Sequence, residues 1–118
     1  MRILIIGAAF ALPTFATAER MVTNTAFCDS DIIEIVDAGE MVLTATGLEG
    51  AEYYCEWDAA IALTYGADLQ EIRSGYCGSS DMIFPKTFAF FADQRMAGHI
   101  RYYESDGDGT ATLFYTCE

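Results

Sequence analysis

Four cysteines behind an amino-terminal export signal constrain this chain more than any other feature. Arg2 precedes the apolar run 3–12, and Ala16-Thr17-Ala18 has the small-residue pattern of a signal-peptide cleavage site. The apolar run is about ten residues, against roughly twenty for a membrane-spanning helix. We therefore expect residues 1–18 to be removed as a signal peptide and a single domain to fold over 19–118, without membrane insertion of the mature chain.

The expected compartment is the periplasm, with secretion to the medium as the alternative. The signal is short and its one positive charge, Arg2, suits a bacterial secretory pathway. A lipid-anchored signal needs a cysteine at the cleavage site, and Cys28 lies ten residues past Ala18. Thiols are oxidised in both compartments, so the cysteines are candidates for disulfides.

Four cysteines allow three pairings, and the sequence alone does not choose between them. Position favours Cys28–Cys117, which would tie the two ends of the domain together, and Cys55–Cys77, which would join neighbouring predicted strands. Each bridge would contribute about 3–5 kcal/mol in the chain-entropy picture. The chain has no C-x-x-C motif and one histidine, so we expect neither a redox pair nor a zinc site, and no cofactor.

Short segments rich in β-branched and aromatic residues, separated by turns, predict an all-β fold. We expect these segments to form a small antiparallel sandwich or barrel of six to seven short strands, joined by disulfides. The predicted strands are 32–36, 41–46, 52–57, 69–77, 83–91, 100–104 and 111–117. The segment 59–65 is compatible with a short helix but is better interpreted as irregular or a strand edge, and 92–98 as a connection or a single helical turn.

Alternation assigns the faces of these strands. Cys55 is expected inside with Tyr54 outside, and Phe88 and Phe90 share the inward face because they are two residues apart. Tyr54 and Tyr103, both on the outer face, are the candidate binding surface, since tyrosine combines contact area with hydrogen bonding. The alternative is that they only form aromatic cross-strand pairs that stabilise the sheet.

The chain is strongly acidic. Its formal charge is −12, and removal of Arg2 with the signal leaves five Lys and Arg against eighteen Asp and Glu, a charge of −13. Nucleic acid and anionic lipid are unsuitable partners, because both are bound through cationic side chains. A cationic protein is electrostatically compatible. The alternative interpretation of the acidity is solubility alone.

Catalytic and metal-binding motifs are weak. His99 is the single histidine and lacks the sequence context of a nucleophile pair, so a strand-edge imidazole is expected. Asp106 and Asp108 resemble part of a calcium loop, but the twelfth position counted from Asp106 is Cys117 where an EF-hand requires glutamate. A solvated hairpin turn is the better interpretation, and an enzyme is not expected.

The chain resembles a loose group of small, exported, four-cysteine proteins of Gram-negative bacteria. The shared stretches are Cys28-Asp29-Ser30-Asp31, residues 44–55, Tyr76-Cys77 and Phe114-Tyr115-Thr116-Cys117. This resemblance implies a fold type and no activity. More weakly, the chain is similar to the periplasmic inhibitors of animal-type lysozyme, which are small disulfide-bonded β-barrels.

Ser74-Gly75-Tyr76 matches only part of the inhibitors' S-G-x-x-Y loop, because the tyrosine follows the glycine directly, so no inhibitory residue is carried over. We expect a non-enzymatic binding domain, with a cationic protein such as a lysozyme as its natural partner. The alternatives are a purely structural or envelope-stress protein, and an enzyme of unrecognised type.

Overall fold

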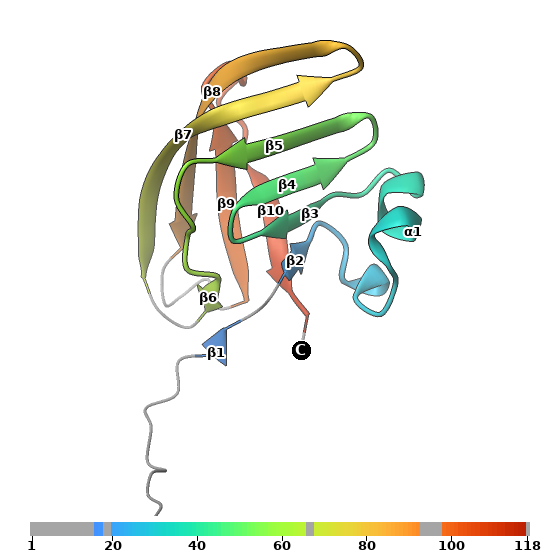
Figure 1. The fold of residues 1–118 in the computed structure, drawn as a ribbon. Helices are drawn as coiled ribbons and strands as arrows, with labels where there is room; N and C mark the ends of the chain where they lie inside the picture. Colours follow the sequence, from blue (N-terminus) through green and yellow to red (C-terminus); the bar gives the residue numbers. More distant parts are fainter. Residues whose placement is uncertain (1–15, 18–19, 66–67, 93–97, 118) are drawn as a thin grey trace, which may run out of the picture.

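Eight antiparallel strands close into an up-and-down barrel (Figure 1). The computed structural model describes residues 16–17, 20–65, 68–92 and 98–117. Each strand pairs with the next along the chain, and the last pairs with the first. The barrel strands are β2 (Arg20–Val22), β3 (Val42–Thr44), β4 (Gly47–Gly50), β5 (Tyr53–Trp57), β7 (Leu69–Ser79), β8 (Met82–Ala92), β9 (His99–Glu104) and β10 (Thr112–Thr116).

The all-β prediction is confirmed, and the closed barrel is the correct one of its two architectures. The predicted number of six to seven strands is too low, because β2 and β4 were not expected. Both are only three or four residues long, too short to show an alternating pattern, and β4 begins and ends with glycine. A separate two-stranded pair joins β1 (Ala16–Thr17) to β6 (Thr64–Tyr65).

Aromatic side chains fill the barrel. Trp57 packs against Phe88 and Phe90 with ring centroids 5.1 and 5.0 Å apart, and both phenylalanines are fully buried. The predicted faces of β8 are therefore confirmed. On β7, Leu69 and Cys77 are buried while Ile72 and Tyr76 are exposed, again as alternation predicts.

The predicted strand 32–36 is wrong, because these residues form the helix α1 (Ile32–Asp37). The Asp31 carboxylate accepts from the Glu34 backbone N–H at 2.9 Å, and the Glu34 side chain accepts from the Asp31 N–H at 3.2 Å. This capping box stabilises the first helical turn and outweighs the strand preference of the isoleucines and the valine. A short 3-10 helix, η2 (Thr25–Phe27), precedes α1.

Helix α1 covers one part of the outer wall of the barrel. Its buried residue, Ile35, packs against Val22 and Val42, which point outward from β2 and β3. The Cys28–Cys117 disulfide borders this cluster and joins the segment before α1 to the end of the chain. The cluster under α1 is therefore separate from the interior of the barrel.

Both disulfides have the pairing that position in the sequence favours, Cys28–Cys117 and Cys55–Cys77. Cys55 and Cys77 are directly opposite on β5 and β7 and point into the barrel. Disulfides of this kind fit an oxidising compartment outside the cytoplasm. Within the part of the chain that is described, no helix is long and apolar enough to cross a membrane.

Two expectations lie partly or wholly outside the described residues. Of the expected signal peptide 1–18, only Ala16 and Thr17 are described, in β1, and the barrel itself begins at Arg20. In the connection 92–98, only its two end residues are described. The segment 59–65 is irregular until β6, in agreement with the preferred interpretation.

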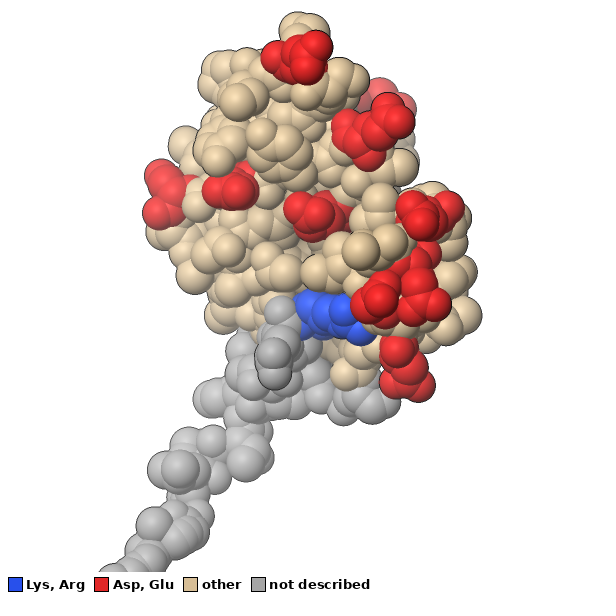
Figure 2. Space-filling view, turned by 45° about the vertical axis from the view of Figure 1, so that its right-hand side comes forward, with Lys and Arg blue, Asp and Glu red and all other residues tan. Residues whose placement is uncertain are grey.

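The surface is acidic wherever it is described. Figure 2 shows acidic side chains spread over the visible face, with basic side chains confined to a small area. Of the fifteen Asp and Glu residues with a described environment, twelve are exposed: Asp29, Asp31, Glu34, Asp37, Glu49, Glu52, Glu56, Asp58, Asp68, Asp81, Asp106 and Asp108. The four described basic residues, Arg20, Arg73, Lys86 and Arg101, are all partly buried.

Candidate functional site at the barrel mouth

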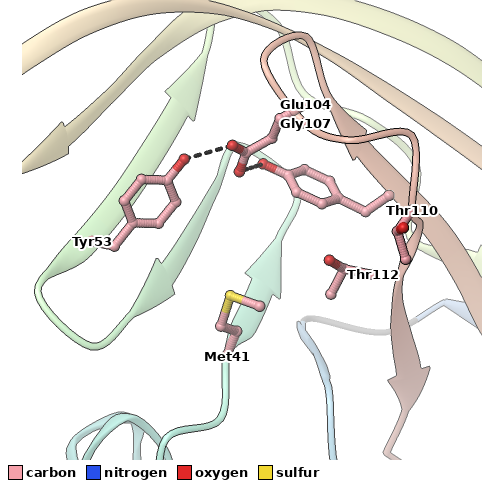
Figure 3. A pocket seen from close by; sticks show the side chains of 7 residues that line it. Met41, Tyr53, Glu104, Gly107, Thr110 and Thr112 are labelled. Carbon is pink, nitrogen blue, oxygen red and sulfur yellow. Dashed lines mark hydrogen bonds between the residues drawn. The ribbon is translucent and has the colours of Figure 1, made fainter.

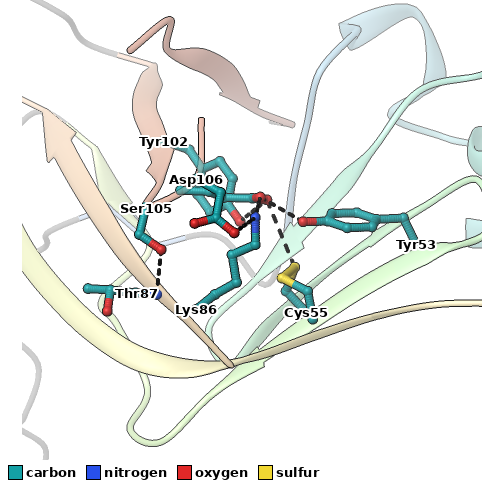
Figure 4. Close-up of a disulfide and its surroundings, with 9 residues drawn as sticks. Tyr53, Cys55, Lys86, Thr87, Tyr102, Ser105 and Asp106 are labelled. Carbon is teal, nitrogen blue, oxygen red and sulfur yellow. Dashed lines mark hydrogen bonds and ion pairs between the residues drawn. A yellow bond between two sulfur atoms is a disulfide. The ribbon is translucent and has the colours of Figure 1, made fainter. Parts of the chain in front are cut away.

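Glu104, the last residue of β9, directs its carboxylate into one end of the barrel. Its alternation partners Ile100 and Tyr102 are buried inward-facing residues of the same strand. The barrel mouth is defined here as the four polar residues that meet there, Tyr53, Lys86, Tyr102 and Glu104 (Figures 3 and 4). They come from β5, β8 and β9: pairing of β8 with β9 brings Lys86 to Glu104, and the curvature of the sheet into a barrel brings Tyr53 to both.

The Glu104 carboxylate accepts hydrogen bonds from three donors. Oε1 accepts from the Tyr53 hydroxyl at 2.6 Å and from Lys86 Nζ at 3.1 Å, and Oε2 accepts from the Tyr102 hydroxyl at 2.7 Å. The Lys86 side chain is only 8% exposed and that of Glu104 18%. Asp106 approaches Lys86 at 3.5 Å from the rim, with its own side chain 71% exposed (Figure 4).

The ammonium of Lys86 is tolerated at this depth because it is paired. A buried charge without a partner is costly, and here a carboxylate and an aromatic ring both face it. Lys86 Nζ lies 5.3 Å from the centre of the Phe84 ring, within the range of a cation–π contact. The lone lysine of the chain is therefore part of the barrel and not of its surface.

The two phenols of the mouth stay protonated. Burial raises the pKa of Tyr53, and the hydrogen bond to the Glu104 carboxylate raises it further. The pKa of Tyr102 is raised for the same two reasons in the same order. Both hydroxyls therefore remain neutral donors to Glu104 at physiological pH.

A pocket of about 290 Å³ opens beside this cluster. Its walls come from the residue before β3, from β5 and from the β9–β10 hairpin, and are Met41, Tyr53, Tyr102, Glu104, Gly107, Thr110 and Thr112 (Figure 3). Because Glu104 already accepts three hydrogen bonds from this chain, it has little remaining capacity to take a proton or a ligand donor. The geometry favours closure of the barrel over acid–base chemistry.

Cys55, Cys77 and Glu104 also place their ligand atoms within 4.8 Å of one another. A metal would need the sulfurs as thiolates, and both are consumed by the disulfide. Cys55 Sγ lies 3.9 Å from Glu104 Oε2, a contact without a hydrogen bond because a disulfide sulfur carries no hydrogen. These residues do not fit a metal centre while the bridge is intact.

The two tyrosines singled out from the sequence do not meet. Tyr54 is on the outer side of β5 and Tyr103 on the outer side of β9, with β7 and β8 between them. Tyr103 packs edge-to-face on Phe91 at 5.8 Å, a cross-strand aromatic pair. The structure therefore divides the proposed surface into two separate positions.

The other sequence candidates also lie apart. His99 is at the opposite end of β9 from Glu104, with its ring 5.6 Å from that of Tyr115. Asp108 accepts from the Thr110 N–H at 2.9 Å, and this bond lowers the pKa of its carboxyl. It therefore caps the hairpin turn, whereas Asp106 forms part of the mouth rim.

Sequence reasoning missed the mouth altogether. Tyr53 and Glu104 are 51 residues apart, and no local motif joins them. One signal was available: Lys86 and Glu104 each lie two residues from a buried aromatic, Phe88 and Tyr102, and so have inward parity. A charged residue at an inward position of a strand predicts a partner of opposite charge at another inward position, as Glu104 on β9 is for Lys86 on the adjacent strand β8.

Comparison with protein-family models, with curated proteins and with solved structures finds no match to this chain. The fold and the mouth define a closed, disulfide-bonded β-barrel with a filled interior. Its function has to follow from its own residues.

Proposed function

We propose that this protein is an exported, non-enzymatic binding domain whose partner is a cationic protein such as a lysozyme. The observation that carries the proposal is the segregation of charge. Twelve of the described acidic residues are exposed, while every described basic residue is partly buried.

Three of the four described basic residues are paired with acceptors of this chain, Lys86 at the barrel mouth among them, whereas Nε of Arg101 is buried without a hydrogen-bond partner. Arg20 donates through Nη2 to the carbonyl oxygens of Cys28 and Ser30 at 2.8 and 2.7 Å. Arg73 donates to the carbonyls of Ala59 and Ala60, at 3.0 and 3.1 Å, and pairs with Glu71 at 2.8 Å. Their charge is used to hold loops, so it does not offset the surface acids.

A surface with one sign of charge accelerates encounter with a partner of the opposite sign and repels like-charged proteins. Solubility would need only a moderate net charge, about 2–8 for a small domain. The charge of −12 for the chain exceeds that range. The excess favours recognition of a cationic partner over solubility alone.

Export to the periplasm is part of the same proposal. The barrel begins at Arg20, directly after the expected mature start at Glu19, so removal of 1–18 would leave all eight barrel strands intact. Two disulfides that use all four cysteines support an oxidising compartment.

The test is calorimetric titration of the exported, oxidised protein with an animal-type lysozyme. We expect saturable one-to-one binding at about 0.15 M salt that weakens steeply with added salt, since screening shortens the field to about 8 Å at that ionic strength. The control is an acidic protein of similar size, which should not bind. Absence of saturable binding to lysozyme, or equal binding of both proteins, would overturn the proposal.

A further inference from the structure

We infer that the cationic partner docks on the outer face of β4, β5, β7 and β8, with an arginine side chain held between Tyr54 and the glutamates beside it. This inference rests on the proposed function above and names the surface that performs it. The Tyr54 face is defined here as Glu49, Tyr54, Glu56, Tyr76 and Ile83.

The strand register places these side chains in two adjacent rows on the outside. One row runs through Glu49, Tyr54, Gly78 and Ile83, and the next through Gly47, Glu56, Tyr76 and Pro85. Between them runs the row Leu48, Cys55, Cys77 and Phe84, which packs inside the barrel. Because successive residues of a strand point to opposite faces, the two flanking rows share the outer face.

The first row continues under α1 on one side. Glu49 is opposite Val42, which is opposite Val22, and Ile35 of α1 covers both valines. Beyond Glu49 the same row has no covering element among the described residues. The Tyr54 face is thus the uncovered half of a sheet face whose other half is packed.

Tyr54 lies across β7 in a position that Gly78 makes available. A Cβ at residue 78 would come within 2.5 Å of the Tyr54 ring, so only glycine permits this orientation. The Tyr76 ring meets Tyr54 at an interplanar angle of 89°, with centroids 6.3 Å apart. The Tyr76 hydroxyl donates to Glu56 Oε1 at 3.0 Å. Oε2 of the same carboxylate is not used by this hydrogen bond.

Two hollows flank Tyr54. One, of about 550 Å³, is lined by Glu49, Glu52 and Tyr54 among others, and the second, of about 140 Å³, by Glu49, Tyr54 and Glu56. Neither lining contains a lysine or an arginine. Each hollow therefore combines an aromatic wall with two carboxylates whose charge no base of the lining neutralises.

These groups match the chemistry of arginine. A guanidinium stacks on an aromatic face and donates two parallel hydrogen bonds to a carboxylate. At the barrel mouth the same residue types are already satisfied by Lys86, whereas Glu49 has no ion-pair partner among the described residues. The field of the surface would steer a cationic protein, and the Tyr54 face would bind its arginine.

The apolar part of the face suits a protein partner. Ile83 is 68% exposed and Tyr76 36%, and both lie on the long β7–β8 hairpin that extends past β9 in Figure 1. Tyr76 is opposite Glu56, and Ile83 is in the same row as Tyr54 and Glu49. Protein interfaces combine such aromatic and aliphatic anchors with a polar rim. A folded cationic protein can cover both parts, which a free metal ion or amine cannot.

The test compares two double variants with the same net charge. Glu49→Gln with Glu56→Gln removes two charges from the Tyr54 face, and Asp68→Asn with Asp108→Asn removes two exposed charges remote from it. With lysozyme as the probe, we expect the first variant to lose affinity about tenfold or more and the second about threefold or less. Tyr54→Ala should lose a similar factor to the first, and thermal melting should show all three variants folded.

The outcomes separate the two proposals. Equal loss in both double variants would mean that only the overall charge matters, which overturns the Tyr54 face and leaves the proposed function standing. Absence of binding by the unchanged protein would overturn the proposed function itself. An amide NMR titration gives an independent measurement, in which Gly78 and Glu49 should shift on addition of lysozyme and Asp68 should not; shifts confined to other residues would also overturn the inference.

Discussion

The barrel mouth and the Tyr54 face contain the same kinds of residue, but the acidic charge is neutralised in the first and not in the second. Tyr53 and Tyr54 are neighbours on β5, and each has a glutamate close by, but their side chains lie on opposite sides of the barrel wall. Inside, Glu104 is neutralised by Lys86 and held by two phenols. Outside, Glu49 and Glu52 have no counter-charge in the linings of the hollows they share with Tyr54.

The difference follows from solvation. An unpaired carboxylate inside the barrel would lose its hydration without compensation, so the chain has to supply its partner. The same group on the surface is stabilised by water and remains available to a partner from another molecule. A cluster of polar residues whose charge is not neutralised within the protein is therefore a better sign of a binding surface than a cluster whose charge is neutralised.

The largest expected effect is at the centre of the mouth. Glu104→Gln leaves the Lys86 ammonium with only the exposed Asp106 as a counter-charge, and we expect it to lower the free energy of unfolding by about 3 kcal/mol. The matched variant Glu49→Gln should change it by less than about 0.5 kcal/mol. Urea denaturation measures both. If both variants lost a similar amount of unfolding free energy, the barrel mouth and the Tyr54 face would not differ in charge balance as described.

The next effect appears on raising the pH. The pKa values of Tyr53 and Tyr102 are raised in the folded protein, so above about pH 10, where free phenols ionise, the folded state retains protons that the unfolded state releases. The free energy of unfolding should therefore be intact below pH 10 and fall as the pH rises above it.

Urea midpoints between pH 8 and pH 11, with phenolate absorbance recorded in parallel, measure this effect. The double variant Tyr53→Phe with Tyr102→Phe serves as the control, and its alkaline loss of stability should be smaller. Full ionisation of all tyrosines near pH 10 in a protein that remains folded would show that the mouth phenols are not held as described.

A smaller effect separates the two neighbours on β5. Tyr53→Phe removes a hydroxyl that donates to a charged carboxylate at 2.6 Å, and should cost about 1.5–2 kcal/mol. Tyr54→Phe keeps the ring that packs against Tyr76 and should be within about 0.5 kcal/mol of the unchanged protein. If Tyr54→Phe were the more destabilising, the Tyr54 hydroxyl would have a structural partner, and the contrast between the inner and the outer tyrosine would be wrong.

The sequence was informative where a pattern repeats over enough residues. Alternation along β8 correctly predicted that Phe88 and Phe90 face inward, because an eleven-residue strand shows several periods. It failed at β2 and β4, where three or four residues contain too few periods to recognise. At α1 the sequence contains two opposed signals, the capping box of Asp31 and Glu34, which favours a helix, and the β-branched run 32–36, which favours a strand.

The Tyr54 face and the barrel mouth also differ in how far local sequence patterns predict them. The outward position of Tyr54 follows from local alternation, so one residue of the proposed docking surface could be named from sequence. Its neighbours in the row belong to strands whose register depends on barrel closure, and they could not. The mouth includes one contact between non-adjacent strands, that of Tyr53 with Glu104 over 51 residues, which no local pattern records.

The smallest expected effect defines the edge of the mouth. Asp106 approaches Lys86 at 3.5 Å, but its side chain is 71% exposed, and exposed ion pairs contribute about 0–1 kcal/mol. Asp106→Asn should therefore lower the free energy of unfolding by less than about 0.5 kcal/mol in urea denaturation, and added salt should reduce even that. A loss comparable with that of Glu104→Gln would mean that Lys86 is held from the rim and not from the interior. The charge balance of the mouth would then depend on a solvent-exposed group, and the contrast with the Tyr54 face would be one of degree.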